Sequence, residues 1–177
     1  MAAIIAVASL CVISTLCVGV GAAIGIPAFV EYTTRSKTVE ASSNLRNLYT
    51  GAAAYYSDES WGSARVNAGG AAQTACAVES AITPTSPGPN KYMLDPSSVP
   101  ESFTALGWTP SDPLYYQYEI VSVGGCGHSA GENLYSFRAY GDLDGDGTTS
   151  MYELTAGVDA NGELYRSPGI YTEQELE

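Results

Sequence analysis

The first thirty residues form an unbroken apolar run. No charged side chain occurs between Met1 and Val30, and this length exceeds the roughly 20 apolar residues that cross a bilayer as a helix. A cleaved secretory signal would have a basic start and an apolar stretch of only about 7–15 residues. The pattern therefore predicts a membrane-anchoring helix over residues 1–30 rather than a cleaved signal.

Beyond Pro27 the pattern changes to that of an amphipathic helix. Turn-forming residues cluster at 57–62, where this helix should end. We therefore expect one very long helix, apolar on all sides over 1–30 and one-sided over 31–60. Its apolar stripe, with spacings of four, three, four and three residues, consists of Ala41, Leu45, Leu48, Ala52 and Tyr55.

Three later segments alternate between apolar and polar residues, which is the pattern of half-buried strands. The first runs from Leu114 to Val123, with its even-numbered positions as the apolar face. The second runs from Tyr135 to Ala139, and the third from Gly162 to Arg166 after a turn. Three or four antiparallel strands, with one face covered by the long helix, make an α+β domain.

The segment that connects the helix to these strands, residues 63–113, is rich in turn formers. Gly69-Gly70 and the proline-rich run 83–90 predict a loop-rich insertion. Three apolar residues are expected to pin this insertion to the core: Phe103, Leu106 and Trp108.

Charge is distributed as unevenly as hydrophobicity. Residues 51–177 carry 17 acidic and 4 basic side chains, a net charge of −13, against +1 for residues 1–50. The chain thus divides into an apolar helix at 1–30, an amphipathic helix at 31–60 and an acidic globular domain at 61–177. Such an acidic field argues against nucleic acid as a partner, because phosphates attract clusters of Lys and Arg. It suits a solvated outer face or cation binding.

The four cysteines divide into two pairs. Cys76 and Cys126 lie in the polar part, and in an exported domain we expect them to form a disulfide, the alternative being two unrelated buried thiols. Cys11 and Cys17 lie six residues apart in the apolar helix, which turns through about 600° over that distance. Their side chains therefore point to different faces, and we expect no bond between them.

The run Ala22-Ala23-Ile24-Gly25-Ile26-Pro27-Ala28-Phe29, followed by Tyr32, Arg35, Lys37 and the apolar stripe, resembles the N-terminal region of type IV pilins and pseudopilins. The resemblance covers about the first 60 residues. It implies that the apolar half of the helix anchors the subunit in the inner membrane and later packs into a filament core. It also implies that the amphipathic half docks onto a small antiparallel sheet.

The sequence departs from that family at Leu10, which stands where the family has a glutamate that sets subunit register. The short basic leader of the family is also missing, and we expect Met1 to be the mature N-terminus. Glycines at 19, 21 and 25 precede Pro27, and both residue types disfavour helix. Since filament pilins often unwind here, we expect a non-helical or stretched segment within 19–27.

The segment from Asp142 to Glu153 matches the calcium-loop template D-x-[DN]-x-[DN]-G-x5-E at every specified position. Carboxylates at positions 1, 3 and 5 converge on a hard cation because Gly147 at position 6 permits a sharp turn. The alternative is an acidic hairpin turn without an ion. The expected Ca2+ ligands are Asp142, Asp144, Asp146 and Glu153 through their carboxylates, Thr148 through its carbonyl, and Ser150 directly or through water.

Other chemistry is weakly represented. His128 is the only histidine, and we expect it to be a solvated loop residue. Cys126 and His128 are too few ligands for zinc. No nucleophile–base pair, phosphate loop or dinucleotide fingerprint occurs, so we expect no enzyme activity. The 13 tyrosines are expected in core and interface positions rather than in electron transport.

These patterns together predict a structural subunit of an extracellular type IV pilus-like filament. Its partners would be identical copies in a helical homopolymer, the inner membrane before assembly, and the pilus assembly machinery. A single transmembrane helix would anchor it before assembly, and the calcium site would be structural. Two alternatives are open: a minor pseudopilin of a secretion system, and a monomeric membrane-anchored, calcium-dependent binding domain.

Overall fold

The computed structural model describes residues 2–57 and 76–175, with side chains for residue 23 and from residue 25 onward. The chain forms two compact units, residues 1–36 and 37–177. Its elements, in chain order, are α1 (Ala2–Tyr56), β1 (Cys76–Ala77), β2 (Ala81–Ile82), the 3-10 helix η2 (Pro96–Ser98), α3 (Glu101–Ala105), β3 (Gln117–Ser122), β4 (Gly125–Cys126), β5 (Asn133–Gly141), β6 (Ser150–Val158), β7 (Leu164–Arg166) and β8 (Tyr171–Glu173).

Helix α1 continues through Pro27 without interruption. The expectation of a non-helical segment within 19–27 is therefore wrong for this chain. Proline removes one backbone donor, but its fixed φ matches that of a helix, so a long helix tolerates the loss of one hydrogen bond. The helix ends at Tyr56, at the start of the predicted turn cluster.

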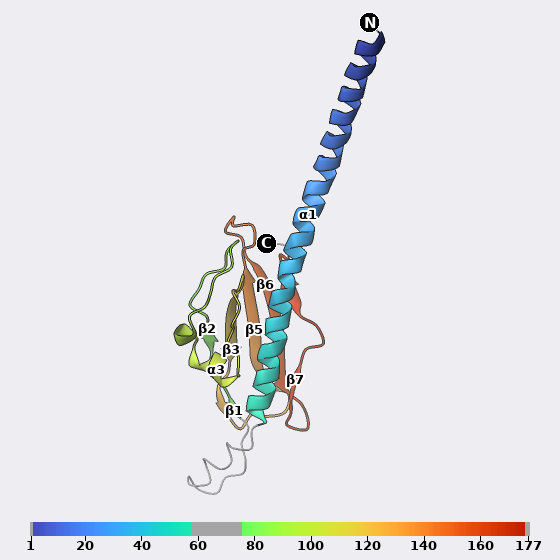
Figure 1. Ribbon diagram of the computed structural model, residues 1–177. Helices are drawn as coiled ribbons and strands as arrows, with labels where there is room; N and C mark the ends of the chain where they lie inside the picture. Colours follow the sequence, from blue (N-terminus) through green and yellow to red (C-terminus); the bar gives the residue numbers. More distant parts are fainter. Residues whose placement is uncertain (1, 58–75, 176–177) are drawn as a thin grey trace, which may run out of the picture. The chain divides into compact units, whose positions relative to one another are not determined.

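Six antiparallel strands form the main sheet, in the order β2-β3-β5-β6-β7, with β8 also paired to β6 (Figure 1). From Lys37 onward, α1 lies along one face of this sheet. The long central strands β5 and β6 form a hairpin, and β7 and β8 share the far edge of β6. The fold of this unit is therefore α+β with antiparallel sheets, as the sequence pattern predicts.

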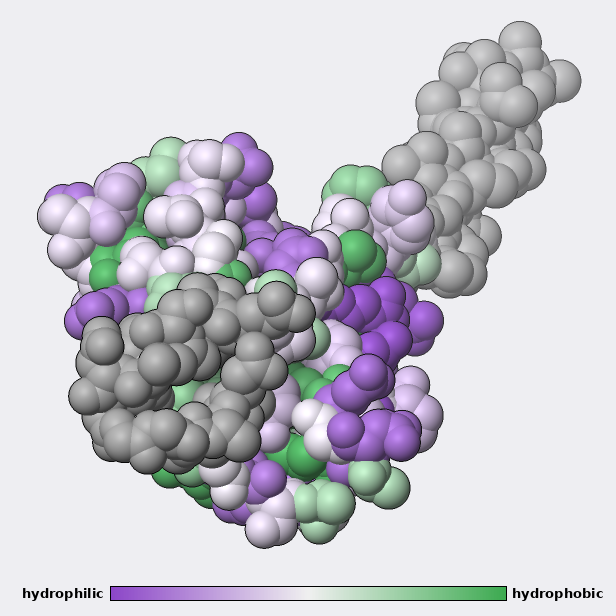
Figure 2. Space-filling model, turned by 90° about the horizontal axis from the view of Figure 1, so that it is seen from below, coloured by the Kyte–Doolittle hydropathy of each residue, from purple (hydrophilic) through white to green (hydrophobic). Residues whose placement is uncertain are grey.

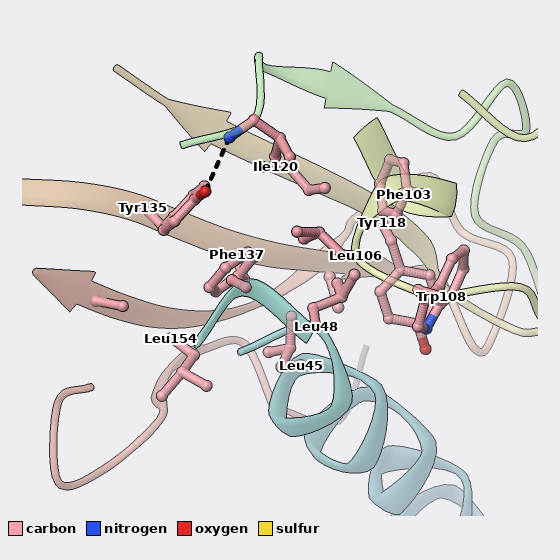
Figure 3. Packing of buried hydrophobic residues seen from close by; sticks show 14 of the residues in the cluster. Leu45, Leu48, Phe103, Leu106, Trp108, Tyr118, Ile120, Tyr135, Phe137 and Leu154 are labelled. Atoms are coloured by element: carbon pink, nitrogen blue, oxygen red, sulfur yellow. Dashed lines mark hydrogen bonds between the residues drawn. The ribbon is translucent and has the colours of Figure 1, made fainter. Parts of the chain in front are cut away.

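The surface and the interior of this unit differ sharply in character. On the face shown in Figure 2, hydrophobic residues lie in separate small areas among hydrophilic ones. Inside, the α1 stripe packs against the inner face of the sheet (Figure 3). The predicted stripe is confirmed at four positions, which are fully buried; at its end Tyr56 is buried and Tyr55 is partly exposed. The sheet contributes the predicted alternating positions Tyr118, Ile120 and Phe137, and also Leu154 on β6, a strand that the sequence pattern did not predict.

The loop-rich insertion is anchored as predicted. Phe103, Leu106 and Trp108 are buried, and the Trp108 ring lies 5.1 Å from that of Phe103 and 5.2 Å from that of Tyr118. Helix α3 approaches α1 so closely that a Cβ atom on Gly51 would lie 2.0 Å from the carbonyl oxygen of Leu106. The absence of a side chain at Gly51 is therefore what permits this contact.

Cys76 and Cys126 form a disulfide, which confirms the expected pair. The two residues face each other in the small sheet made by β1 and β4. Strand β4 lies within the glycine-rich stretch 124–127, between β3 and β5. The side chains of Cys11 and Cys17 lie outside the described residues, so the expectation about them stays a prediction.

Candidate functional site

The hairpin loop between β5 and β6, residues 142–149, contains the densest group of acidic side chains in the described part of the chain. One carboxylate oxygen from each of Asp142, Asp144 and Asp146 lies within 4.8 Å of the others. Gly145 and Gly147 adopt φ values of 82° and 90°, a region that disfavours side chains. The glycines thus permit the tight turn that gathers the three aspartates.

Backbone amides of the loop hold the carboxylates in place. The amide of Gly145 donates to Asp142 at 2.7 Å, and that of Asp146 donates to Asp144 at 3.1 Å. The amide of Thr148 donates to Asp146 at 2.6 Å, and this bond lowers the pKa of Asp146. Each bond engages one oxygen of its carboxylate. Oxygen atoms gathered in this way are the donors that a hard cation such as Ca2+ prefers.

Ser150, an expected calcium ligand, does not lie in the loop with the aspartates. It is the first residue of β6 and is fully buried, and its hydroxyl donates to the carbonyl of Gly141 at 3.3 Å. Thr148 lies in the loop itself, half-exposed. Of the two non-carboxylate positions, Thr148 is thus the one placed among the loop aspartates.

Glu153 is not brought to the loop. It lies on β6, three residues after Ser150 and therefore roughly 10 Å along the strand. Its carboxylate accepts hydrogen bonds from Ser136 and from Arg138, the latter at 2.9 Å. In an EF-hand a helix follows the loop, whereas here a strand begins at the ninth template position and extends away. The expected four-carboxylate site is therefore corrected to three aspartates.

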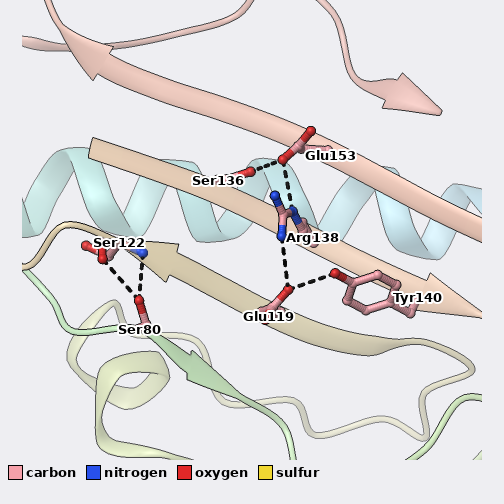
Figure 4. Close-up of polar contacts among 7 residues, drawn as sticks. All are labelled: Ser80, Glu119, Ser122, Ser136, Arg138, Tyr140 and Glu153. Carbon is pink, nitrogen blue, oxygen red and sulfur yellow. Dashed lines mark hydrogen bonds and ion pairs between the residues drawn. The ribbon is translucent and has the colours of Figure 1, made fainter. Parts of the chain in front are cut away.

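Glu153 instead belongs to a charged row on the outer face of the sheet (Figure 4). Arg138 lies between Glu153 on β6 and Glu119 on β3, at 2.9 Å and 3.6 Å. The hydroxyl of Tyr140 donates to Glu119 at 2.8 Å. Partial burial opposes the charged form of Glu153, but the bonds from Ser136 and Arg138 outweigh it and lower its pKa. The row therefore ties β3, β5 and β6 together.

A second candidate feature is the apolar surface of α1 in the first unit. Ile26, Phe29, Val30 and Tyr32 are 63%, 67%, 54% and 71% exposed. Large apolar side chains exposed together mark interaction sites more often than isolated ones do. Nearby, Glu31 and Arg35 form an ion pair at 2.7 Å along the helix.

Among the residues that the structure describes, no helix is both long and apolar enough to cross a membrane. The side chains of residues 2–22 lie outside the description, so the expected packing of the apolar half of the helix into a filament core stays a prediction.

Two polar residues of α1 that the sequence pattern did not single out join the helix to the sheet side. Glu40 accepts a hydrogen bond from the amide of Tyr115 at 2.8 Å, and Asn44 donates to the hydroxyl of Tyr118 at 2.8 Å. Asn44 also accepts from the indole of Trp108 at 3.3 Å. Burial and the Glu40 carboxylate raise the pKa of Tyr118. Position beside the apolar stripe is the one sequence signal that marks Glu40 and Asn44.

His128 is not the solvated loop residue expected from sequence. Its side chain is 8% exposed, and its two ring nitrogens lie 3.3 Å from the carboxylate of Glu132 and 3.2 Å from the carbonyl of Gly125. The ring also lies 6.3 Å from that of Tyr56. The loop after β4 folds back so that His128 is enclosed, and the amino-acid composition of this loop does not predict that fold.

The described chain thus presents two candidate features, the aspartate loop at 142–149 and the exposed apolar surface of α1 at 26–32. Neither a protein-family model, nor a curated protein, nor a solved structure matches this chain.

Proposed function

We propose that this protein is a structural subunit of an extracellular type IV pilus-like filament that polymerises through its N-terminal helix. The observation that carries the proposal is the exposed apolar surface of α1 at Ile26, Phe29, Val30 and Tyr32, which includes the end of the uncharged run from Met1 to Val30. Burying a large apolar side chain contributes about 1.5–3 kcal/mol. Burial of these side chains between packed helices would therefore favour assembly, and the isolated chain leaves them exposed.

In this proposal the apolar helix lies in the inner membrane before assembly and in the filament core afterwards. The assembly machinery transfers each subunit from one apolar environment to the other. The acidic domain stays outside, where its net charge favours solvation. The α+β architecture supports the proposal, because a sheet that docks on the second half of the helix leaves the first half available for packing.

A structural calcium site is part of the proposal. The carboxylates of Asp142, Asp144 and Asp146 and the carbonyl of Thr148 would hold the ion, with solvent completing its coordination. A bound Ca2+ would neutralise the repulsion among three converging carboxylates. Because the loop joins β5 to β6, these residues would stiffen the end of the central hairpin.

The deciding experiment is electron microscopy of the assembled protein with an α1 variant and a matched control. We expect thin fibres with a helical repeat from the natural sequence and from Met93→Ser, which changes an exposed apolar residue of the globular unit. We expect none from Phe29→Asp, because a buried unpaired charge opposes helix packing. Membrane fractionation before assembly checks that Phe29→Asp still reaches the bilayer. Fibres from Phe29→Asp, or none from the natural sequence, would contradict the proposal.

The aspartate loop favours one function of a different class, a monomeric membrane-anchored domain that binds a partner in the presence of calcium. In that case micrographs would show separate particles, and α1 would contact lipid alone. Short assemblies instead of long fibres would indicate a minor pseudopilin of a secretion system.

A further inference from the structure

A cleft of about 530 Å³, lined by polar and apolar residues, opens within the unit of residues 37–177, between α1 and the loop at 107–114. Its volume lies in the range of small-molecule sites. The residues that bear on its chemistry are Glu40, Ser43, Asn44, Asn47, Lys91 and Asp112.

Part of the lining is held rigidly by buried partners. Asn44 is fixed by Tyr118 and Trp108, and Glu40 by the amide of Tyr115. Lys91 lies 3.6 Å from Glu40, and its ammonium stands 4.9 Å from the centre of the Tyr115 ring. These contacts fix the cleft wall before any ligand arrives, which lowers the entropy cost of binding.

Other lining groups are available to a ligand. Ser43, Asn47 and Asp112 are exposed, and within the described part of the chain their side chains make no hydrogen bond or ion pair. A hydroxyl and an amide supply donors as well as acceptors, and the carboxylate adds acceptors only, so acceptor sites outnumber donor hydrogens. That combination suits a ligand whose own groups both donate and accept.

The charges of the lining oppose an anionic ligand. Glu40 and Asp112 oppose an anion, and the one ammonium, that of Lys91, already faces Glu40. Trp108 and Leu114 are buried, but Pro110 and Pro113 also line the cleft, so part of its wall is apolar and can contact the C–H faces of a sugar ring. We infer that this cleft binds a neutral, hydroxyl-rich ligand, a saccharide. The inference does not depend on the filament proposal, since the cleft lies within one unit of one chain.

The test is a titration of the full-length chain, solubilised in a detergent without sugar headgroups. The probes are glucose, galactose, mannose and N-acetylglucosamine, and ethylammonium serves as the cationic comparison. Trp108 lines the cleft and reports binding by fluorescence, once Trp61→Phe has removed the other tryptophan. We expect a saturable change with at least one sugar and none with ethylammonium.

Substitutions then locate the site. Asn47→Ala and Ser43→Ala should each weaken sugar binding about fivefold, the effect of one lost hydrogen bond. Arg46→Ala is the matched control, because Arg46 is an exposed neighbour on α1 outside the cleft lining, and it should leave the affinity unchanged. No saturation with any sugar, unchanged affinity in both cleft variants, or preferential binding of ethylammonium would each overturn the inference.

Discussion

Arg138 and Glu153 face each other directly across β5 and β6, with the guanidinium Nε 2.9 Å from Oε1 of the carboxylate. Arg138 thus binds the glutamate that the calcium-loop template assigns to the ion. Glu153 therefore joins neighbouring strands, whereas the three loop aspartates converge on one another.

Calcium should stabilise the protein through the loop aspartates and not through Glu153. At a hundredfold excess over Kd, binding to the folded state adds about 2.7 kcal/mol to the free energy of unfolding. We expect this increment in the natural protein and in Glu153→Gln, and its loss in Asp144→Asn with Asp146→Asn. Denaturant unfolding with calcium or with chelator measures it. Loss of the increment in Glu153→Gln would restore the four-carboxylate site, and no increment in the natural protein would leave an acidic turn.

The bonds to Glu153 predict a dependence of stability on pH. Its pKa is lowered below the ordinary value of 4.5 in the folded protein. The stabilisation is therefore present above the ordinary pKa and is lost as pH falls through the folded value. Glu153→Gln should cost about 1–2 kcal/mol at neutral pH, and this difference should shrink below about pH 4.5.

The control for that titration is Glu173→Gln, an exposed carboxylate on β8 outside the Glu119–Arg138–Glu153 row. Denaturant midpoints measured from roughly pH 3 to pH 8 should show little difference for the control. A Glu153→Gln difference that stays constant through the acid range would contradict the assignment.

Gly51 should be intolerant of even one added carbon. Its Cβ would lie 2.0 Å from the carbonyl oxygen of Leu106, so α3 must move away from α1. We expect Gly51→Ala to destabilise by about 1–3 kcal/mol, although alanine favours helix by about 1 kcal/mol. Gly25→Ala is the matched control in the same helix, because no atom lies within 4 Å of its added Cβ. Thermal unfolding of both variants distinguishes them, and equal midpoints would refute the close approach.

Asn44 should contribute to stability, whereas Asn47, one turn along α1, should not. Asn44→Ala leaves the indole of Trp108 and the hydroxyl of Tyr118 without their shared partner. An unsatisfied buried polar group costs about 1–3 kcal/mol. Asn47 is exposed, and Asn47→Ala should change stability by less than about 0.5 kcal/mol. Similar losses in the two variants, measured by chemical unfolding, would show that the Asn44 contacts are not formed.

The local pattern of the sequence was sufficient for α1, β3 and β5 and their buried faces, but it did not predict the central strand β6. The α1 stripe from Ala41 to Ala52 and the alternation along β3 follow from periods of 3.6 and 2, which depend on neighbours in the chain. The Cys76–Cys126 pair could likewise be expected, because the two cysteines of the polar region allow only one pairing with each other. The continuity of α1 at Pro27 could not, since local helix penalties compete with the stability of the whole helix.

By itself, then, the sequence determined an apolar N-terminal helix, an acidic antiparallel domain and a turn rich in aspartate. Tertiary structure alone decided that Glu153 pairs with Arg138, that Asn44 joins α1 to Tyr118, and that the ring of His128 lies near that of Tyr56. The physical reason is register. A strand that starts at Ser150 sets which residue faces Glu153 across the sheet, and hydrogen bonds between residues distant in sequence form only after that pairing is fixed.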